Sequence, residues 1–194
     1  MAMVAYAGDV KDGERAIAPL RALAEPIADM VRPMSYADMY PPEEEEYRPV
    51  AVAKTMFVDS VGLGATETIV ERIQASDAMM AATQIRLLGG AMARVPADAT
   101  AFAHRGSRIM VNVAAMYQAP EERPKHAAWV DGLSDELLQD DPGAYAGFLA
   151  DEGEERIRAA YPGPTWDRLR DVKRQYDPDN VFRLNQNIPP ADGI

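Results

Sequence analysis

The sequence has 194 residues, of which 47% are hydrophobic, and its formal net charge is −11. This length and apolar content suffice for one domain with a core, with or without a small appendage, and argue against disorder. The negative charge repels phosphate backbones, so nucleic acid is not an expected partner. The sequence shows neither a long uninterrupted apolar run nor the order of a signal peptide. We therefore expect no membrane span and a cytoplasmic location.

The sequence offers few side chains for metal binding or nucleophilic catalysis. The sequence contains no cysteine and only two histidines, His104 and His126. This composition excludes disulfides and thiolate sites, and it offers little for a histidine metal site or a catalytic triad. The PPEEEEY run at 41–47 is interpreted as a solvated loop, because adjacent carboxylates do not converge on a cation. No metal site is expected.

The predicted elements begin with a strand over 3–7 and a helix over 12–24 that is kinked or delayed by Pro19. A strand so close to the first residue suggests a chain that begins in the middle of a longer protein. A strand over 50–58 and an amphipathic helix over 66–80 follow. The helix is expected to bury Met79 and Met80 in the core.

Three more strands are expected, over 84–88, 101–104 and 108–117. The last one alternates, so that two sets of side chains face opposite ways: Ile109, Val111, Val113 and Ala115 on one side, and Met110, Asn112, Ala114 and Met116 on the other. Both sets are mostly apolar, so both faces should be covered. Asn112 must then find a polar partner or face a cavity.

Helices are expected over 124–139, 152–160 and 164–176, with a short extended segment over 143–148. The DPDN turn at 177–180 ends the last helix, because a residue before proline leaves the helical region. The strands lack the regular alternation with helices that a parallel sheet requires. The predicted fold class is therefore α+β, an antiparallel sheet with helices packed mainly on one face.

The segment YDPDNVFRLNQNI at 176–188, which follows a helix, resembles the carboxy-terminal signature of berberine-bridge-enzyme-type FAD-linked oxidases of the vanillyl-alcohol-oxidase superfamily. The stretches 84–105 and 8–23 are also similar to this family. The resemblance implies a substrate-binding domain over 1–160 and a berberine-like helix and tail over 161–194. It also implies that the family's separate FAD-binding domain is absent from this chain.

The resemblance implies two catalytic candidates. Tyr145 matches a tyrosine-x-asparagine motif whose tyrosine is a proposed base for the substrate hydroxyl, although the asparagine is replaced by Gly147 here. Asn112 matches a position that points over the flavin toward the substrate. The alternatives are a packed tyrosine and a satisfied buried amide.

The resemblance also implies two cofactor-binding candidates, Asn185 and Asn187, which match residues near the isoalloxazine ring of FAD. An amide suits that place because it offers a donor and an acceptor to a pyrimidine-like edge. The alternative is a polar tail. His104 and Arg105 match a family pair that we interpret as structural.

The implied function is the substrate-binding part of an FAD-dependent oxidoreductase that oxidises a small hydroxyl- or amine-bearing molecule. FAD is the implied cofactor, and because the FAD-binding domain is absent, the chain alone is expected to be inactive and not to bind FAD strongly. The expected partners are the substrate and either a separate FAD-binding polypeptide or a second copy, because a flavin-facing apolar surface would otherwise be exposed. The alternative is a non-enzymatic small-molecule-binding or self-associating module that has lost the flavin domain.

Overall fold

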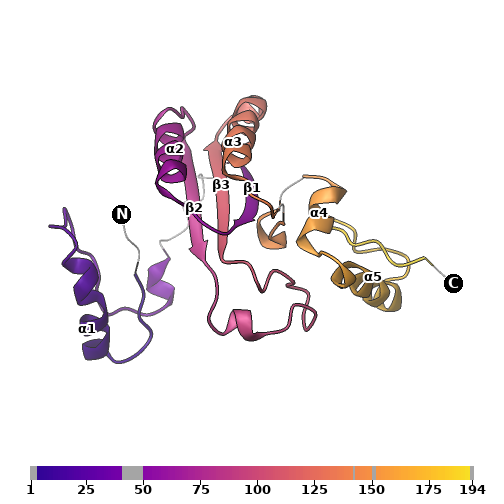
Figure 1. Cartoon of the computed structure of the whole chain (residues 1–194), viewed down its shortest axis with the longest axis horizontal. Coiled ribbons are helices and arrows are strands. Elements are labelled where there is room, and N and C mark those ends of the chain that lie inside the picture. Colours follow the sequence, from indigo (N-terminus) through magenta and orange to yellow (C-terminus); the bar gives the residue numbers. More distant parts are fainter. Residues whose placement is uncertain (1–3, 41–49, 142, 150–151, 193–194) are drawn as a thin grey trace. The chain divides into compact units, whose positions relative to one another are not determined.

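The computed structural model describes residues 4–40, 50–141, 143–149 and 152–192 (Figure 1). The chain divides into two compact units, 1–47 and 48–194. The glutamate run at 41–47 lies outside the described residues. Among the described residues, no helix combines the length and apolar character that crossing a membrane requires. The expected functional division after residue 160 stays a prediction.

The first unit is built around helix α1 (Val10–Arg21), which contains Pro19 as expected. The helix starts earlier than predicted because the Asp9 carboxylate caps it, accepting from the backbone N–H of Lys11 at 2.9 Å. A short 3₁₀ helix, η1 (Ala37–Met39), follows. The predicted strand over 3–7 is wrong for its described residues, 4–7, which form no ladder. The ring of Tyr6 packs there against Gly13 instead.

The second unit is organised on a three-stranded antiparallel sheet in the order β1-β3-β2. The strands are β1 (Val50–Val58), β2 (Met80–Leu87) and β3 (Ile109–Tyr117). Asn112 of the central strand lies opposite Thr55 of β1 and Gln84 of β2. Directly opposed residues share a face, so these three side chains form one polar row across the sheet.

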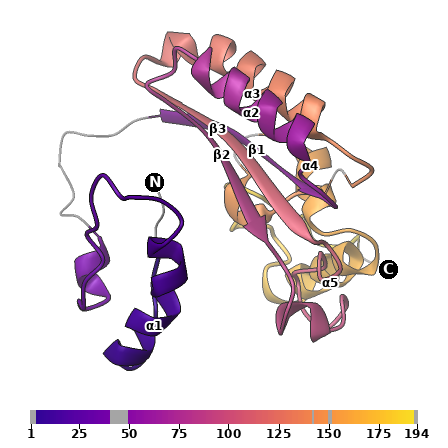
Figure 2. The same cartoon turned by 60° about the vertical axis from the view of Figure 1, so that its left-hand side comes forward.

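Helices α2 (Leu63–Gln74) and α3 (Arg123–Leu137) lie side by side on one face of the sheet (Figure 2). The apolar set predicted for β3 points toward them, and with residues of both helices it forms the buried core: Met56, Val58, Ile69, Val111, Val113, Ala115, Val130, Leu133 and Leu137. The fold is therefore α+β with an antiparallel sheet, as predicted. Both faces of β3 are largely buried, also as predicted.

Three predicted elements need correction between β1 and β3. Helix α2 ends at Gln74, and the chain turns where the Ser76 hydroxyl accepts from the N–H of Ala78. Strand β2 therefore starts at Met80. Met79 and Met80 are 41% and 47% exposed and not in the core.

The predicted strand over 101–104 is a loop. The Arg105 guanidinium holds it, donating to the carbonyl oxygens of Phe102 and Met92 and to the hydroxyl of Thr100. The bond to Phe102 satisfies a carbonyl group that a strand over 101–104 would have offered to a neighbouring strand. A short 3₁₀ helix, η2 (Met92–Arg94), lies before this loop. Another, η3 (Pro120–Glu122), lies between β3 and α3.

The carboxy-terminal region contains η4 (Ala146–Phe148), α4 (Glu154–Ala160) and α5 (Pro164–Tyr176). The segment over 143–148 is thus 3₁₀ in its second half and not extended throughout. Asp177 fixes the turn after α5, because its carboxylate accepts from the N–H groups of Val181 and Phe182 at 2.8 and 3.0 Å. The tail then returns along α5, where the N–H of Ala191 donates to the carbonyl of Arg170 at 3.1 Å.

Candidate functional site

The sheet face that points away from α2 and α3 carries the candidate catalytic residues, and we call it the site face. It is defined by Thr55 and Phe57 of β1, Gln84 and Arg86 of β2, and Met110 and Asn112 of β3. Successive residues of a strand point to opposite faces, so this set alternates with the apolar core set. The strand register thus separates a packing face from a face with polar side chains.

Asn112 sits at the centre of the site face. Its side chain is 5% exposed, and its Oδ1 is buried without a hydrogen-bond partner among the described residues. An unsatisfied buried acceptor costs about 1–3 kcal/mol. A ligand that donates an O–H or N–H at this position would remove that cost. The substrate-facing role of Asn112 stays a prediction, and this orphaned oxygen is consistent with it.

Tyr145 is anchored next to Asn112. Its backbone N–H donates to the Thr55 hydroxyl at 3.2 Å, and Thr55 is the β1 partner of Asn112. The Tyr145 side chain is 37% exposed, and its ring makes edge contacts with Phe102 and Phe148. The structure therefore brings both predicted catalytic residues to one face, although Tyr145 and Thr55 are 90 positions apart.

An aromatic row extends across the site face through Tyr145. Neighbouring ring centroids are separated by 4.3 to 6.1 Å, in the order Phe57, His104, Phe102, Tyr145 and Phe148. The guanidinium of Arg86 lies 4.6 Å from the centroid of the Phe148 ring and closes the row. Offset and edge contacts of this kind add to the stabilisation from burial alone.

His104 has a packing role in this row. Its ring is buried and stacks on Phe57. Burial lowers the pKa of His104, and the charge of Asp141 and the backbone of Ala159 and Ala160 oppose this shift. The neutral ring is therefore favoured. A buried, stacked and neutral ring agrees with the structural interpretation of His104. The hydrogen bonds that Arg105 makes within the loop agree with the structural interpretation of Arg105.

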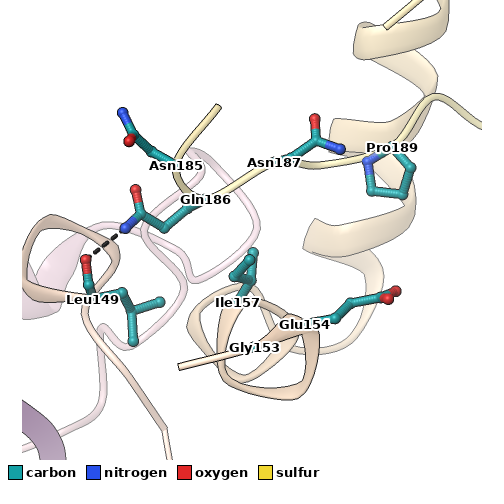
Figure 3. A pocket seen from close by; sticks show the side chains of 8 residues that line it. All are labelled: Leu149, Gly153, Glu154, Ile157, Asn185, Gln186, Asn187 and Pro189. Atoms are coloured by element: carbon teal, nitrogen blue, oxygen red, sulfur yellow. Dashed lines mark hydrogen bonds between the residues drawn. The ribbon is translucent and has the colours of Figure 1, made fainter. Parts of the chain in front are cut away.

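The two predicted cofactor-binding residues line a cavity of about 690 Å³ between α4 and the returning tail (Figure 3). The lining consists of Leu149, Gly153, Glu154, Ile157, Asn185, Gln186, Asn187 and Pro189. Asn187 Oδ1 is buried and has no hydrogen-bond partner in the described part of the chain. The backbone of Asn185 is left-handed, with φ of 60°, a conformation that asparagine tolerates well.

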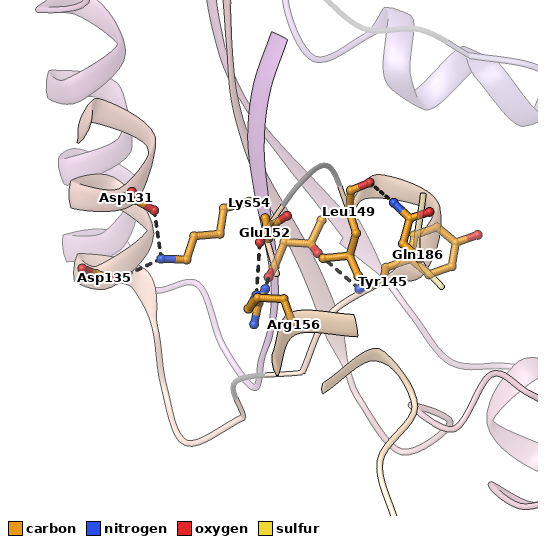
Figure 4. A network of polar contacts seen from close by, with 9 residues as sticks. Lys54, Asp131, Asp135, Tyr145, Leu149, Glu152, Arg156 and Gln186 are labelled. Carbon is orange, nitrogen blue, oxygen red and sulfur yellow. Dashed lines mark hydrogen bonds and ion pairs between the residues drawn. The ribbon is translucent and has the colours of Figure 1, made fainter. Parts of the chain in front are cut away.

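Gln186 points away from its two neighbours and ties the tail to the rest of the site. Its Nε2 donates to the carbonyl oxygen of Leu149 at 2.5 Å (Figures 3 and 4). Leu149 follows η4, so the segment 145–149 is held to β1 at one end and to the tail at the other. Tyr145 and Asn112 do not line the cavity of Asn185 and Asn187. The segment 145–149 connects this cavity with the site face.

A polar network fixes the segment and α4 to the sheet (Figure 4). Arg156 of α4 donates to the carbonyl of Thr55 at 2.6 Å and pairs with Glu152 at 3.1 Å. On the opposite face, the Lys54 ammonium lies 3.1 and 3.4 Å from the carboxylates of Asp131 and Asp135 on α3. Consecutive residues of β1 thus fasten the sheet to the elements on both sides.

The predicted site omitted Thr55, Arg86, Gln186 and Tyr161. Tyr161 packs beside the segment 145–149, and burial raises its pKa, with a further contribution from the charge of Tyr145. Alternation in the strand predicted over 84–88 could have indicated Arg86. In the described ranges, no three histidine, aspartate or glutamate side chains lie together in a way that could hold a metal ion.

Residues 144–189, which include the segment, α4, α5 and the cavity-lining tail, match the family model described as "Berberine and berberine like". The FAD-linked oxidoreductase YgaK of Bacillus subtilis (strain 168) is 39% identical over 103 residues, which are 53% of this chain and 23% of that protein. The FAD-linked oxidoreductase sorD of Penicillium rubens is 32% identical over 109 residues, with 53% and 23% covered. The chain spans less than a quarter of these curated relatives.

Solved structures show the same fold. The berberine bridge enzyme from Eschscholzia californica matches with a TM-score of 0.62 at 20% identity, over 78% of this chain and 35% of that chain. Glycopeptide hexose oxidase DBV29, solved with teicoplanin, matches with a TM-score of 0.64 at 23% identity, over 78% and 34%. Residues 144–189 therefore belong to the berberine and berberine-like family, and the matched part of the chain is similar to part of an FAD-linked oxidoreductase.

Proposed function

We propose that this chain supplies the substrate-facing side of an FAD-dependent oxidoreductase that oxidises a small hydroxyl- or amine-bearing molecule. The observation that carries the proposal is the shared face of Tyr145 and Asn112, which Thr55 holds in place. The relatives' designation as FAD-linked oxidoreductases supports the reaction class. The proposal places the FAD-binding domain outside these 194 residues.

Each site residue has its own role in the proposed reaction. Tyr145, acting as its phenolate, takes the proton from the substrate hydroxyl or amine and becomes the neutral phenol. The orphaned Oδ1 of Asn112 accepts a hydrogen bond from the substrate and orients it. The aromatic row forms an apolar wall that excludes water on one side of Tyr145. When bound, FAD supplies the acceptor for the hydride.

The residues around the tail cavity fit the isoalloxazine ring. The cavity volume of about 690 Å³ lies within the range of about 300–1,000 Å³ that is usual for ligand pockets. Asn187 has an unused buried acceptor, and its amide also offers donors, as a pyrimidine-like edge requires. Asn185 and Asn187 would hold this edge, and Gln186 would keep the tail in place through Leu149.

Binding of FAD tests the proposal. Equilibrium dialysis of the purified chain against FAD, read by visible flavin absorbance, should show bound flavin. Asn187→Ala should bind FAD about tenfold more weakly, because one hydrogen bond to the ring is lost. Gln175→Ala is the matched control, since this amide lies on the exposed side of α5 and does not line the cavity.

Circular dichroism would establish that each variant is folded. A folded chain that binds no FAD, or an Asn187→Ala variant that binds it as well as the unchanged chain does, would contradict the assignment of the cavity to the flavin.

A further inference from the structure

The site face carries a single charged side chain, Arg86. All residues of the three strands are described, and on this face the others are alanine, threonine, phenylalanine, methionine, asparagine and glutamine. The chain as a whole has a net charge of −11, yet it places a cation and no carboxylate on this face of the sheet. Within the described part of the chain, no ion pair includes Arg86.

The exposed side chain of Arg86 stacks on a neighbouring ring, and no hydrogen bond to another described residue uses its guanidinium edge. Its guanidinium lies over the face of Phe148, 4.6 Å from the ring centroid, and the Phe148 ring lies 5.4 Å from that of Tyr145. Stacking on a ring orients a guanidinium and leaves its in-plane N–H donors available. The Phe148 ring therefore contacts both Arg86 and the candidate base, Tyr145.

The strand register sets the separation between Arg86 and Asn112. Arg86 lies opposite Met110, and Asn112 lies opposite Gln84, so Arg86 and Asn112 are diagonal neighbours on adjacent strands. Such neighbours have Cβ atoms about 7–8 Å apart. A molecule with an anionic group and a hydroxyl or amine only a few bonds apart would span this separation.

We propose that Arg86 binds a carboxylate of the substrate, so that the site takes a small hydroxy acid or amino acid and not a neutral alcohol or amine. This inference rests on the proposed function and names its substrate class. A planar guanidinium matches a carboxylate through two parallel hydrogen bonds. One cation suits a monoanionic carboxylate, whereas a phosphate dianion on so acidic a chain would need more positive charge.

Mandelate provides the probe, because it joins a ring, a hydroxyl and a carboxylate, and mandelamide is its neutral counterpart. Calorimetric or NMR titration of the full chain, without FAD, should show mandelate binding at least about tenfold tighter than mandelamide binding. Added salt should weaken mandelate binding and leave mandelamide binding unchanged.

The Arg86→Gln variant should lose the preference for mandelate. Arg94→Gln is the matched control, since Arg94 is an exposed arginine of η2 outside the sheet, and it should keep the preference. Thermal unfolding would show whether the variants are as stable as the unchanged chain.

Three results would overturn the inference: no mandelate binding by the folded chain, equal binding of mandelate and mandelamide, or an unchanged preference in Arg86→Gln. Because the titration contains no flavin and measures no turnover, each of these would leave the FAD-binding result intact. The substrate class and the proposed function can thus fail separately.

Discussion

Replacing Gly143 by alanine should lower the free energy of unfolding by about 2 kcal/mol, the usual size of an overpacking effect. A Cβ at this position would lie 2.5 Å from Cε1 of His104, 2.8 Å from Oδ1 of Asp141 and 2.9 Å from Cδ2 of Phe57. His104 and Phe57 form the stacked end of the aromatic row, so neither ring can move without breaking the stack. Urea denaturation measures the change.

Gly132→Ala is the control for this substitution. Gly132 lies inside α3, and nothing lies within 4 Å of the place where its Cβ would stand. Alanine in a helix interior is more favourable than glycine by up to about 1 kcal/mol, so this variant should be more stable. Equal stability changes in the two variants would show that the close packing around Gly143 is not real.

Replacing Arg156 by alanine should have the second large effect, a loss of about 2–3 kcal/mol in the free energy of unfolding. The order β1-β3-β2 makes β1 an edge strand, and Arg156 donates to the Thr55 carbonyl from outside the sheet. The Arg156 and Glu152 side chains are only 20% and 17% exposed. Removing the guanidinium would leave a largely buried carboxylate unpaired and a carbonyl without its donor.

Arg158→Ala separates this effect from a general loss of charge on α4. Arg158 is exposed, and its guanidinium lies 5.7 Å from the centroid of the Trp166 ring. An exposed substitution of this kind should change stability by no more than about 0.5 kcal/mol. If the two arginine variants unfolded at the same urea concentration, the contact between Arg156 and β1 would not fasten α4 to the sheet.

The core strands and helices could be predicted because the spacing of their apolar residues follows the period of a strand or a helix. The alternation over 109–117 placed Asn112 on the face opposite Val111 and Val113, as the structure has it. The helix over 164–176 and its Asp-Pro stop were also predicted correctly, since a proline and its preceding residue act locally. The predicted strands over 101–104 and over the described residues 4–7 are wrong, because a strand exists only where a neighbour completes its ladder.

The site depends on contacts that no local pattern contains. Thr55 binds the backbone of Tyr145, 90 positions away, and only the fold brings them together. The closeness of Arg86 to the site could not be predicted without the pairing of β2 with β3, because only this register makes Arg86 a diagonal neighbour of Asn112. Asn185 and Asn187 were proposed from the family resemblance, and the return of the tail along α5 places them on a cavity.

The central claim is that the site face and the tail cavity form one side of a flavin site. An amide NMR titration of the chain with FAD tests it most directly. We predict shifts confined to residues 144–149, 185–189 and the neighbourhood of Asn112, with α2 and α3 unaffected. Shifts that fall on α2 and α3, or a folded chain that shows none, would contradict the account.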